Sequence, residues 1–434
     1  MMKKLICMLA ALGVLTGFTP LMAEGETETT EETAEENTEE TEEAKPEITG
    51  PDIQGVSSIL IDAASGTVLA RKDSARHISP AALTKSMGVY LAVSSLKNDQ
   101  LVTMSSDAFQ TYDHSSGVIW IMEEESVPAI DLEYASLMQN ANDTMAMLAE
   151  AVSGTPEAFV AKMNSTAAEL GMVNTQYSNI FGVYDEGHYT CAEDLAILTR
   201  KAMRDTSFSR IYGTPAYRIA PTALQSNERL LAANCEMLRS GADYYSEAQG
   251  CQIGYTRQDG YVLTAAATRN GLDLIAVVLG TESEADAYED AHTLFEYGFS
   301  HFQNVEITPE AIGTKTVEIY ENSKHVADVT FSVEQGFSAL LSSGVDRSAL
   351  KAEIVTRNEE TNNPNLIEAE VVFTLEGQQV GTAEMKKKIT TYDTAEVKKS
   401  SLLSPRQIFD YFCIAVLAGI LIIKISHGLT PPAE

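Results

Sequence analysis

Two pairs of β-rich segments, each separated by a turn signal, predict two hairpins. The segments are residues 57–62 and 67–70, and residues 261–268 and 272–280. Ala64-Ser65-Gly66 separates the first pair, and Asn270-Gly271 separates the second. Asn-Gly between two apolar runs is a strong signal for a tight turn.

Apolar residues recur at helical spacing in the long region between these hairpins and again after the second. Helices are predicted over residues 81–96, 131–152, 155–171 and 284–299, and one more opens at residues 190–193. Thr155 followed by Pro156 is typical of a helix start, and Gly171 is typical of an end. Thr190 and Glu193 have the spacing of a capping box.

From about residue 305 the pattern changes to short alternating strands, such as residues 315–320 and 368–373. These strands predict a small β-sandwich domain over residues 304–397. The preceding mixture of antiparallel strands and helices predicts an α+β domain over residues 55–303. A chain of 434 residues is long enough for both.

Both ends of the chain carry segments that do not resemble a folded core. Residues 1–23 have the charged start, apolar stretch and small-residue end of a signal peptide, and residues 24–54 predict a disordered, acidic Glu/Thr-rich linker. Residues 408–425 predict a transmembrane anchor, between a linker at 398–407 and a short tail at 426–434. An amphipathic helix on the membrane surface is the alternative. We therefore expect a protein exported across the cytoplasmic membrane and anchored to its outer face.

The net charge and the counts of histidine and cysteine limit the ligands and partners that this protein can have. The formal net charge of -32 argues against nucleic acid, because phosphate binding needs clustered Lys and Arg. The 7 histidines show no paired ligand spacing, so neither a metal nor a cofactor is expected. Cys191, Cys235 and Cys251 belong to the folded region. Cys235 and Cys251 either form a disulfide or remain free thiols, and the sequence leaves both possibilities open.

The strongest chemical signal is an incomplete nucleophile motif. In Ser-x-x-Lys at a helix start, one helical turn brings a lysine amine to the serine hydroxyl, whose proton it takes. The corresponding residues here are Ala82-Leu83-Thr84-Lys85, so the base position is kept and the nucleophile position is an alanine. Ser94-Ser95-Leu96-Lys97 is a literal match, but it lies about 18 Å farther along the same predicted helix. We interpret it as a coincidental polar surface.

Several blocks, together with the order of elements, resemble the serine D-alanyl-D-alanine carboxypeptidases. These are the low-molecular-mass penicillin-binding proteins, or peptidase family S11. The blocks are residues 155–164, 169–175, 188–196, 254–256 and 274–280. The resemblance covers roughly residues 56–303. It implies a β-lactamase/penicillin-binding-protein-like fold, in which helices flank an antiparallel sheet, and a link to peptidoglycan stem peptides.

The resemblance assigns two further motif positions, and both are altered. Where the family has Ser-x-Asn on a loop, this chain has Asn140-Ala141-Asn142, and an amide cannot relay a proton as a hydroxyl does. Where the family has Lys-Thr-Gly on a strand, this chain has Gln252-Ile253-Gly254. The family's lysine attracts the substrate carboxylate, and the backbone after its glycine, here Tyr255, contributes to the oxyanion hole.

These changes predict a pseudoenzyme with no intact catalytic residue. The nucleophile position is Ala82, the base position Lys85, and the second-motif positions Asn140 and Asn142. The substrate-binding positions are Gln252, Ile253, Gly254 and Tyr255. Lys85 is expected either to bond to Asn142 or to bind a ligand carboxylate, and Ala82 and Ile253 are expected to make the cleft more apolar.

Three functions remain open at this point. The leading expectation is a non-catalytic protein that binds peptidoglycan stem peptides, or a cell-wall or membrane protein partner, through the old cleft or the sandwich. The second is a residual carboxypeptidase with an unrecognised nucleophile. The third is a pure protein–protein interaction module whose cleft is filled.

Overall fold

The computed structural model describes residues 50–115, 117–321 and 323–392. The predicted signal peptide, most of the acidic linker and the predicted anchor lie outside these residues. Within the described residues, no helix combines the length and the apolar character that a membrane span requires.

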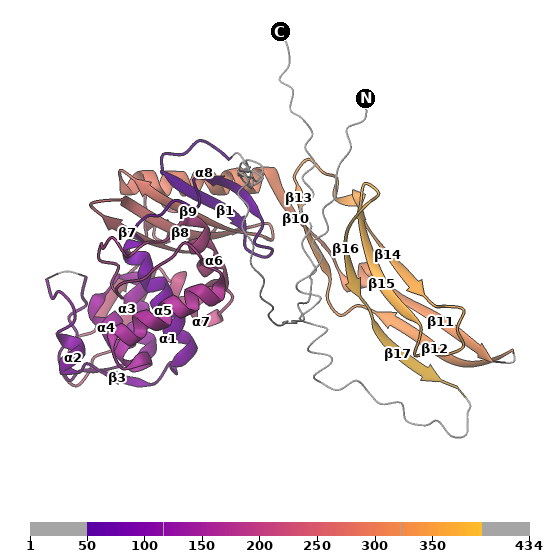
Figure 1. The fold of residues 1–434 in the computed structure, drawn as a ribbon, viewed down its shortest axis with the longest axis horizontal. Helices are drawn as coiled ribbons and strands as arrows, with labels where there is room; N and C mark the ends of the chain where they lie inside the picture. Colours follow the sequence, from indigo (N-terminus) through magenta and orange to yellow (C-terminus); the bar gives the residue numbers. More distant parts are fainter. Residues whose placement is uncertain (1–49, 116, 322, 393–434) are drawn as a thin grey trace, which may run out of the picture. The chain divides into compact units, whose positions relative to one another are not determined.

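A five-stranded antiparallel sheet forms the centre of the first domain, in the order β2-β1-β9-β8-β7 (Figure 1). Its strands are β1 (Ser57–Asp62), β2 (Val68–Lys72), β7 (Ala248–Thr256), β8 (Gly260–Arg269) and β9 (Leu272–Thr281). Both predicted hairpins are confirmed. Asn270 and Gly271 have φ of 53° and 78°, as a type I′ turn requires. Because β7 is an edge strand among the described residues, one side of its backbone has no strand partner there.

Helices cover both faces of this sheet. Helix α8 (Glu284–His301) packs on one face, and α6 (Ala192–Met203) with the 3₁₀ turn η1 (Ala81–Leu83) packs on the other (Figure 1). Ala276 of β9 faces α8, and its neighbour Ile275 faces α6. The central strands are therefore almost continuously buried, as expected when both faces are covered.

A layer of further helices and short strands has its own apolar core. Its elements are α1 (Thr84–Ser95), β3 (Leu101–Thr103), α2 (Ser106–Phe109), β4 (Ser126–Pro128), α3 (Ala129–Met138), α4 (Asn142–Ser153), α5 (Pro156–Leu170), α7 (Thr206–Tyr212), β5 (Ala216–Ile219), β6 (Arg229–Ala232) and η2 (Glu236–Leu238). The single helix predicted over 131–152 is wrong: α3 and α4 are separate. The chain breaks at Asn140, whose φ of 51° lies in the left-handed region that no helix can continue through.

The predicted helix caps are partly confirmed. The Thr155 side chain accepts the Ala158 N–H at the start of α5, and Gly171 ends that helix in the left-handed conformation. The predicted capping box at Thr190 is wrong. The N-cap of α6 is Cys191, whose sulfur accepts the Asp194 N–H.

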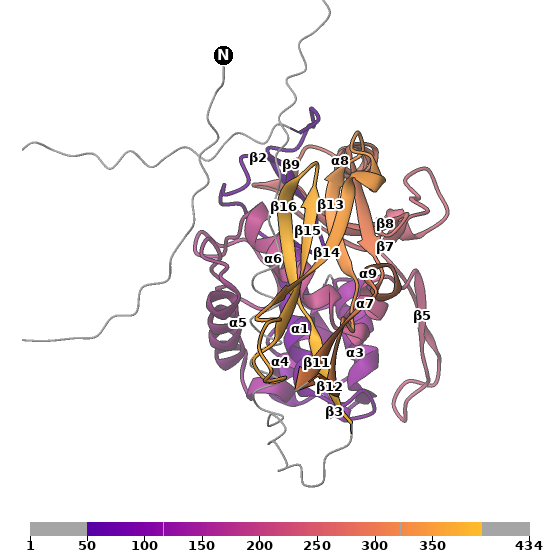
Figure 2. The same ribbon diagram turned by 90° about the vertical axis from the view of Figure 1, so that its right-hand side faces the viewer.

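Residues 302–391 form three small antiparallel sheets, of order β10-β13, β11-β12-β17 and β14-β15-β16 (Figure 2). Their elements are β10 (Phe302–Ile307), α9 (Pro309–Ile312), β11 (Thr314–Glu321), β12 (Lys324–Ser332), β13 (Phe337–Ser342), η3 (Arg347–Ala349), β14 (Leu350–Arg357), β15 (Glu368–Leu375), β16 (Gln378–Glu384) and β17 (Lys386–Thr391). Two apolar clusters, around Phe373 and Phe331, hold them together.

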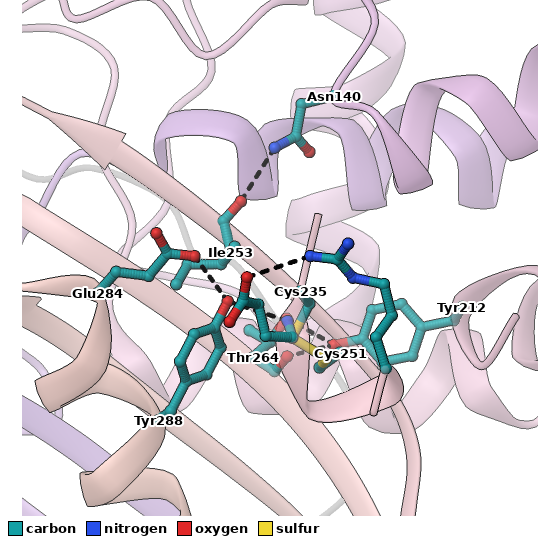
Figure 3. Close-up of a disulfide and its surroundings, with 10 residues drawn as sticks. Asn140, Tyr212, Cys235, Cys251, Ile253, Thr264, Glu284 and Tyr288 are labelled. Carbon is teal, nitrogen blue, oxygen red and sulfur yellow. Dashed lines mark hydrogen bonds and ion pairs between the residues drawn. A yellow bond between two sulfur atoms is a disulfide. The ribbon is translucent and has the colours of Figure 1, made fainter. Parts of the chain in front are cut away.

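Cys235 and Cys251 form a disulfide, which resolves the alternative that the sequence left open (Figure 3). It joins the segment before η2 to the edge strand β7. The two half-cystines are 16 residues apart. Cross-links that close loops of this size stabilise a fold by roughly 3 kcal/mol, mainly by restricting the unfolded chain.

Replacing both half-cystines, as Cys235→Ser with Cys251→Ser, is expected to lower the free energy of unfolding by roughly 2–4 kcal/mol. Urea denaturation of the two proteins measures the difference. Cys191→Ser is the matched control, because serine also caps helices, and should change stability by less than about 1 kcal/mol. Equal midpoints for the double variant and the parent would contradict the stabilising role.

Candidate functional site

The three substituted motif positions come from three separate elements. Ala82 lies in η1, Asn140 in the turn between α3 and α4, and Gln252 in β7. The strand runs directly against the turn, since a Cβ on Gly254 would lie 2.7 Å from the Ala82 nitrogen. Only glycine allows this approach.

The Gln252 carboxamide links the three positions. Its Nε2 donates to the Ala82 carbonyl at 3.0 Å and to Asn140 Oδ1 at 3.1 Å. Its Oε1 accepts a short hydrogen bond from the Ser86 hydroxyl. The side chain is buried, and both of its N–H groups and its oxygen have partners. The substituted residues thus form one closed hydrogen-bonded cluster, which we call the amide bridge (Ala82, Ser86, Asn140 and Gln252).

Asn140 also contacts the edge of the sheet. Its Nδ2 donates to the Ile253 carbonyl at 3.0 Å (Figure 3). A carbonyl on the open side of an edge strand is the acceptor that an added peptide strand would use. The Asn140 side chain therefore occupies a docking position of β7.

Lys85 does not bond to Asn142, so that expectation is wrong. Its amine donates to the Phe181 carbonyl at 2.7 Å, whereas the Asn142 N–H bonds to the Gly117 carbonyl at 2.5 Å. The lysine side chain is only 2% exposed. Burial lowers the pKa of Lys85 to about 7, and the charge of Asp143 opposes this shift.

The remaining predicted binding residues point elsewhere. The Ile253 side chain packs in the apolar cluster on the α8 face, with Cys251 and Leu263, so it does not make the cleft more apolar. Tyr255 is 56% exposed and lies beside Tyr261, with 4.7 Å between ring centroids. Two of the four predicted substrate-binding positions therefore face Ala82: Gln252 through its side chain and Gly254 through its Cα.

Thr84 and His188 resemble a nucleophile–base pair but have the wrong protonation. Thr84 Oγ1 lies 2.8 Å from His188 Nε2. His188 Nδ1 accepts the Ser178 N–H at 2.9 Å, so the ring proton is on Nε2 and is donated to Thr84. A nitrogen that carries a proton cannot take one from a hydroxyl. The pair is structural, and burial lowers the pKa of His188 to about 4.

The literal Ser-x-x-Lys match is a surface feature. The Ser94 hydroxyl donates to the Tyr90 carbonyl at 2.9 Å in an exposed setting, and Lys97 follows the end of α1. A cavity of about 10 Å³, with room for about one water molecule, lies between Asn140, Gln252 and the Cys235–Cys251 disulfide.

Sequence reasoning missed two groups at the site. Ser86 lies four residues after Ala82, and that spacing on a helix places two side chains on one face. The contribution of Ser86 could therefore have been predicted from its spacing. The contribution of the Phe181 carbonyl could not, because any residue supplies a backbone acceptor.

The sheet, its two helical layers and the site at its edge define a penicillin-binding-protein-like fold. Penicillin binding protein 5 from Haemophilus influenzae superimposes with a TM-score of 0.61 at 24% identity, over 78% of this chain and 98% of that one. The family model for D-alanyl-D-alanine carboxypeptidase, peptidase S11, matches residues 40–283. This is more than half of the chain, which therefore belongs to that family, as its motif blocks predicted.

Two curated relatives agree. The chain is 27% identical to the D-alanyl-D-alanine carboxypeptidase DacF of Bacillus subtilis over 335 residues, which is 76% of this chain and 81% of DacF. It is 29% identical to DacC of Escherichia coli over 279 residues, which is 62% of this chain and 67% of DacC.

The buried Lys85 amine predicts a pH dependence of stability. Its pKa is about 7 in the folded protein and about 10.4 in an unfolded chain. Between these values the unfolded state binds more protons, so folding becomes more favourable as pH rises. Relative to a Lys85→Met variant, the parent should gain roughly 4 kcal/mol of stability between about pH 7 and pH 10.

Urea unfolding of both proteins across this range measures the gain. Lys97→Met, at an exposed position, is the control and should differ from the parent by a constant amount. A constant difference for Lys85→Met as well would show that the amine keeps its ordinary pKa.

Proposed function

We propose that this chain is a non-catalytic member of the carboxypeptidase family, anchored outside the cytoplasmic membrane, which acts by binding a cell-wall protein partner. One observation carries the proposal. The three positions that hold reactive groups in the family motifs are instead bonded to one another through the Gln252 carboxamide.

The chemistry of the amide bridge does not support acyl transfer. Ala82 has no nucleophilic atom, and loss of a nucleophile alone costs about 10⁶-fold in turnover in a serine peptidase. Asn140 cannot relay a proton, and Gln252 brings no charge to attract a carboxylate. The Lys85 amine is buried and donates to the Phe181 carbonyl, and the alanine at position 82 offers it no hydroxyl proton to take.

The filled site favours a protein partner over a stem peptide in the cleft. A peptide that pairs with β7 must displace Asn140 from the Ile253 carbonyl and open its bond to Gln252. Each bond of this kind contributes about 1 kcal/mol net. Opening two of them costs roughly 2 kcal/mol, which weakens peptide binding about thirtyfold.

The predicted location rests on the two ends of the sequence. An amino-terminal pattern typical of a signal peptide and a carboxy-terminal apolar run would place the described domains outside the cytoplasm. The long acidic segment at residues 24–43 suits a solvated tether.

Covalent labelling by a fluorescent penicillin tests the absence of acyl chemistry. The purified full chain is expected to show no label, and Ala82→Ser alone is also expected to show none, because Asn140 and Gln252 still bridge the site. The triple variant Ala82→Ser, Asn140→Ser, Gln252→Lys restores the family motif at each position and is the variant expected to acylate. Penicillin binding protein 6B from Escherichia coli is the positive control.

A labelled parent chain would overturn the proposal in favour of the residual enzyme. Full labelling of the single variant would show that the amide bridge does not block the site.

Calorimetric titration with a peptide ending in D-Ala-D-Ala tests the filled cleft. The parent should show no saturable binding at about millimolar peptide, whereas Asn140→Gly, which keeps the left-handed backbone but loses the side chain, should bind about thirtyfold more tightly. Asn270→Gly is the matched control, since Asn270 is also left-handed and lies in the distant β8–β9 turn. Saturable binding by the parent would instead favour stem-peptide recognition in the cleft.

A further inference from the structure

A second, larger pocket lies beside the start of α4, and four of its nine lining residues carry aromatic rings. Its volume is about 360 Å³, within the usual range for small-ligand sites. Phe109, Tyr112, His114 and Trp120 supply aromatic walls, and Glu123 and Asp143 supply carboxylates. None of the groups of the amide bridge lines it.

Three of the rings pack against one another. The centroids of Phe109 and His114, and of Tyr112 and His114, are both 4.4 Å apart, with interplanar angles of 51° and 44°. Phe109 and Tyr112 meet edge to face at 6.1 Å. The three rings therefore pack into one tilted aromatic wall of the pocket, instead of forming a single stack.

Trp120 completes the wall from an unusual backbone position. It is the only tryptophan in the chain, and 67% of its surface is exposed. Its φ of 65° is left-handed, which is rare for a bulky residue and costs of order 1–3 kcal/mol. Holding this large apolar side chain at the surface therefore lowers the stability of the folded protein.

Hydrogen bonds on both sides of Trp120 fix this conformation. Asp143 Oδ2 accepts the Ile119 N–H at 3.0 Å and the Ile121 N–H at 3.1 Å. Arg229 Nη2 donates to the Trp120 carbonyl at 3.1 Å. Arg229 is itself held by a buried ion pair with Glu125 at 2.8 Å. Strain that the surroundings maintain in this way is typical of ligand clamps.

The charges at the pocket favour a cation. Glu123 lines it with an exposed carboxylate, and its lining includes no Lys or Arg among the described residues. The Asp143 carboxylate also borders it but is buried and accepts backbone N–H groups. The nearby Arg229 is neutralised by Glu125. Burial, and to a lesser extent the charge of Asp143, raise the pKa of Tyr112 to about 12. Faces of aromatic rings attract cations by about 0.5–2 kcal/mol.

We propose that this pocket binds a protonated primary amine carried on an aliphatic arm. The ammonium group lies between the Trp120 ring and the wall formed by Tyr112 and His114, with Glu123 as its counter-ion, and the aliphatic arm packs along Met122. The inference does not depend on the proposed function, because it uses none of the residues of the amide bridge. A neutral sugar ring, which also stacks on aromatic faces, is the competing occupant.

Fluorescence of the single tryptophan provides a direct readout. The full chain is titrated with n-pentylamine hydrochloride, with 1-pentanol as the uncharged probe of similar size and with N-acetylglucosamine as the sugar. We expect a saturable change with pentylammonium, and at least about fivefold weaker binding of pentanol, which corresponds to the loss of one cation–π contact. Calorimetry repeats each titration independently of the indole signal.

Two isosteric variants separate the local carboxylate from the overall acidity. Glu123→Gln is expected to weaken pentylammonium binding about fivefold or more and to leave pentanol binding unchanged. Glu124→Gln removes the same charge at the neighbouring exposed position, outside the pocket lining, and should bind as the parent does. Circular dichroism checks that both variants fold.

Four results would overturn the proposal: no saturable binding of pentylammonium by either method, equal affinity for pentanol, preferred binding of N-acetylglucosamine, or the same loss in both glutamine variants.

Discussion

The satisfaction of one buried carboxamide, that of Gln252, organises the candidate site. A buried amide must place two N–H donors and one carbonyl acceptor, and each one left unpaired costs about 1–3 kcal/mol. Here the partners are the Ala82 carbonyl, Asn140 Oδ1 and the Ser86 hydroxyl. An unpaired lysine at the same buried position would bring a charge and no acceptor. The amides at positions 140 and 252 are thus physically coupled, because each supplies a hydrogen-bond partner to the other.

Much of the fold could be predicted, because short-range patterns carry it. The Asn270-Gly271 turn, the Thr155 cap and the Gly171 stop each depend on residues within a few positions of one another. The break at Asn140 could not be predicted in this way, since apolar residues keep their helical spacing across it. The cap at Cys191 was missed because sulfur is a weak acceptor and Thr190 has the more usual side chain.

The sequence was sufficient to predict which positions form the candidate site, but not which hydrogen bonds connect them. The motifs identified Ala82, Asn140 and Gln252 from a resemblance. The bond between Asn140 and Gln252 joins residues 112 positions apart, and only the assembled fold brings them together. The same limit explains the error at Lys85. The acceptor of its amine is the Phe181 backbone carbonyl, which no side-chain pattern marks.

The position of Asn140 on β7 has one more consequence. An exposed edge strand with a buried apolar face is a template on which identical copies of a protein can aggregate. Natural sheets usually protect such edges with a charge, a proline or a bulge. In this chain an amide side chain from another element takes up the Ile253 carbonyl. The Asn140 side chain, which links the turn between α3 and α4 to the sheet, thereby also protects this part of the edge against self-association.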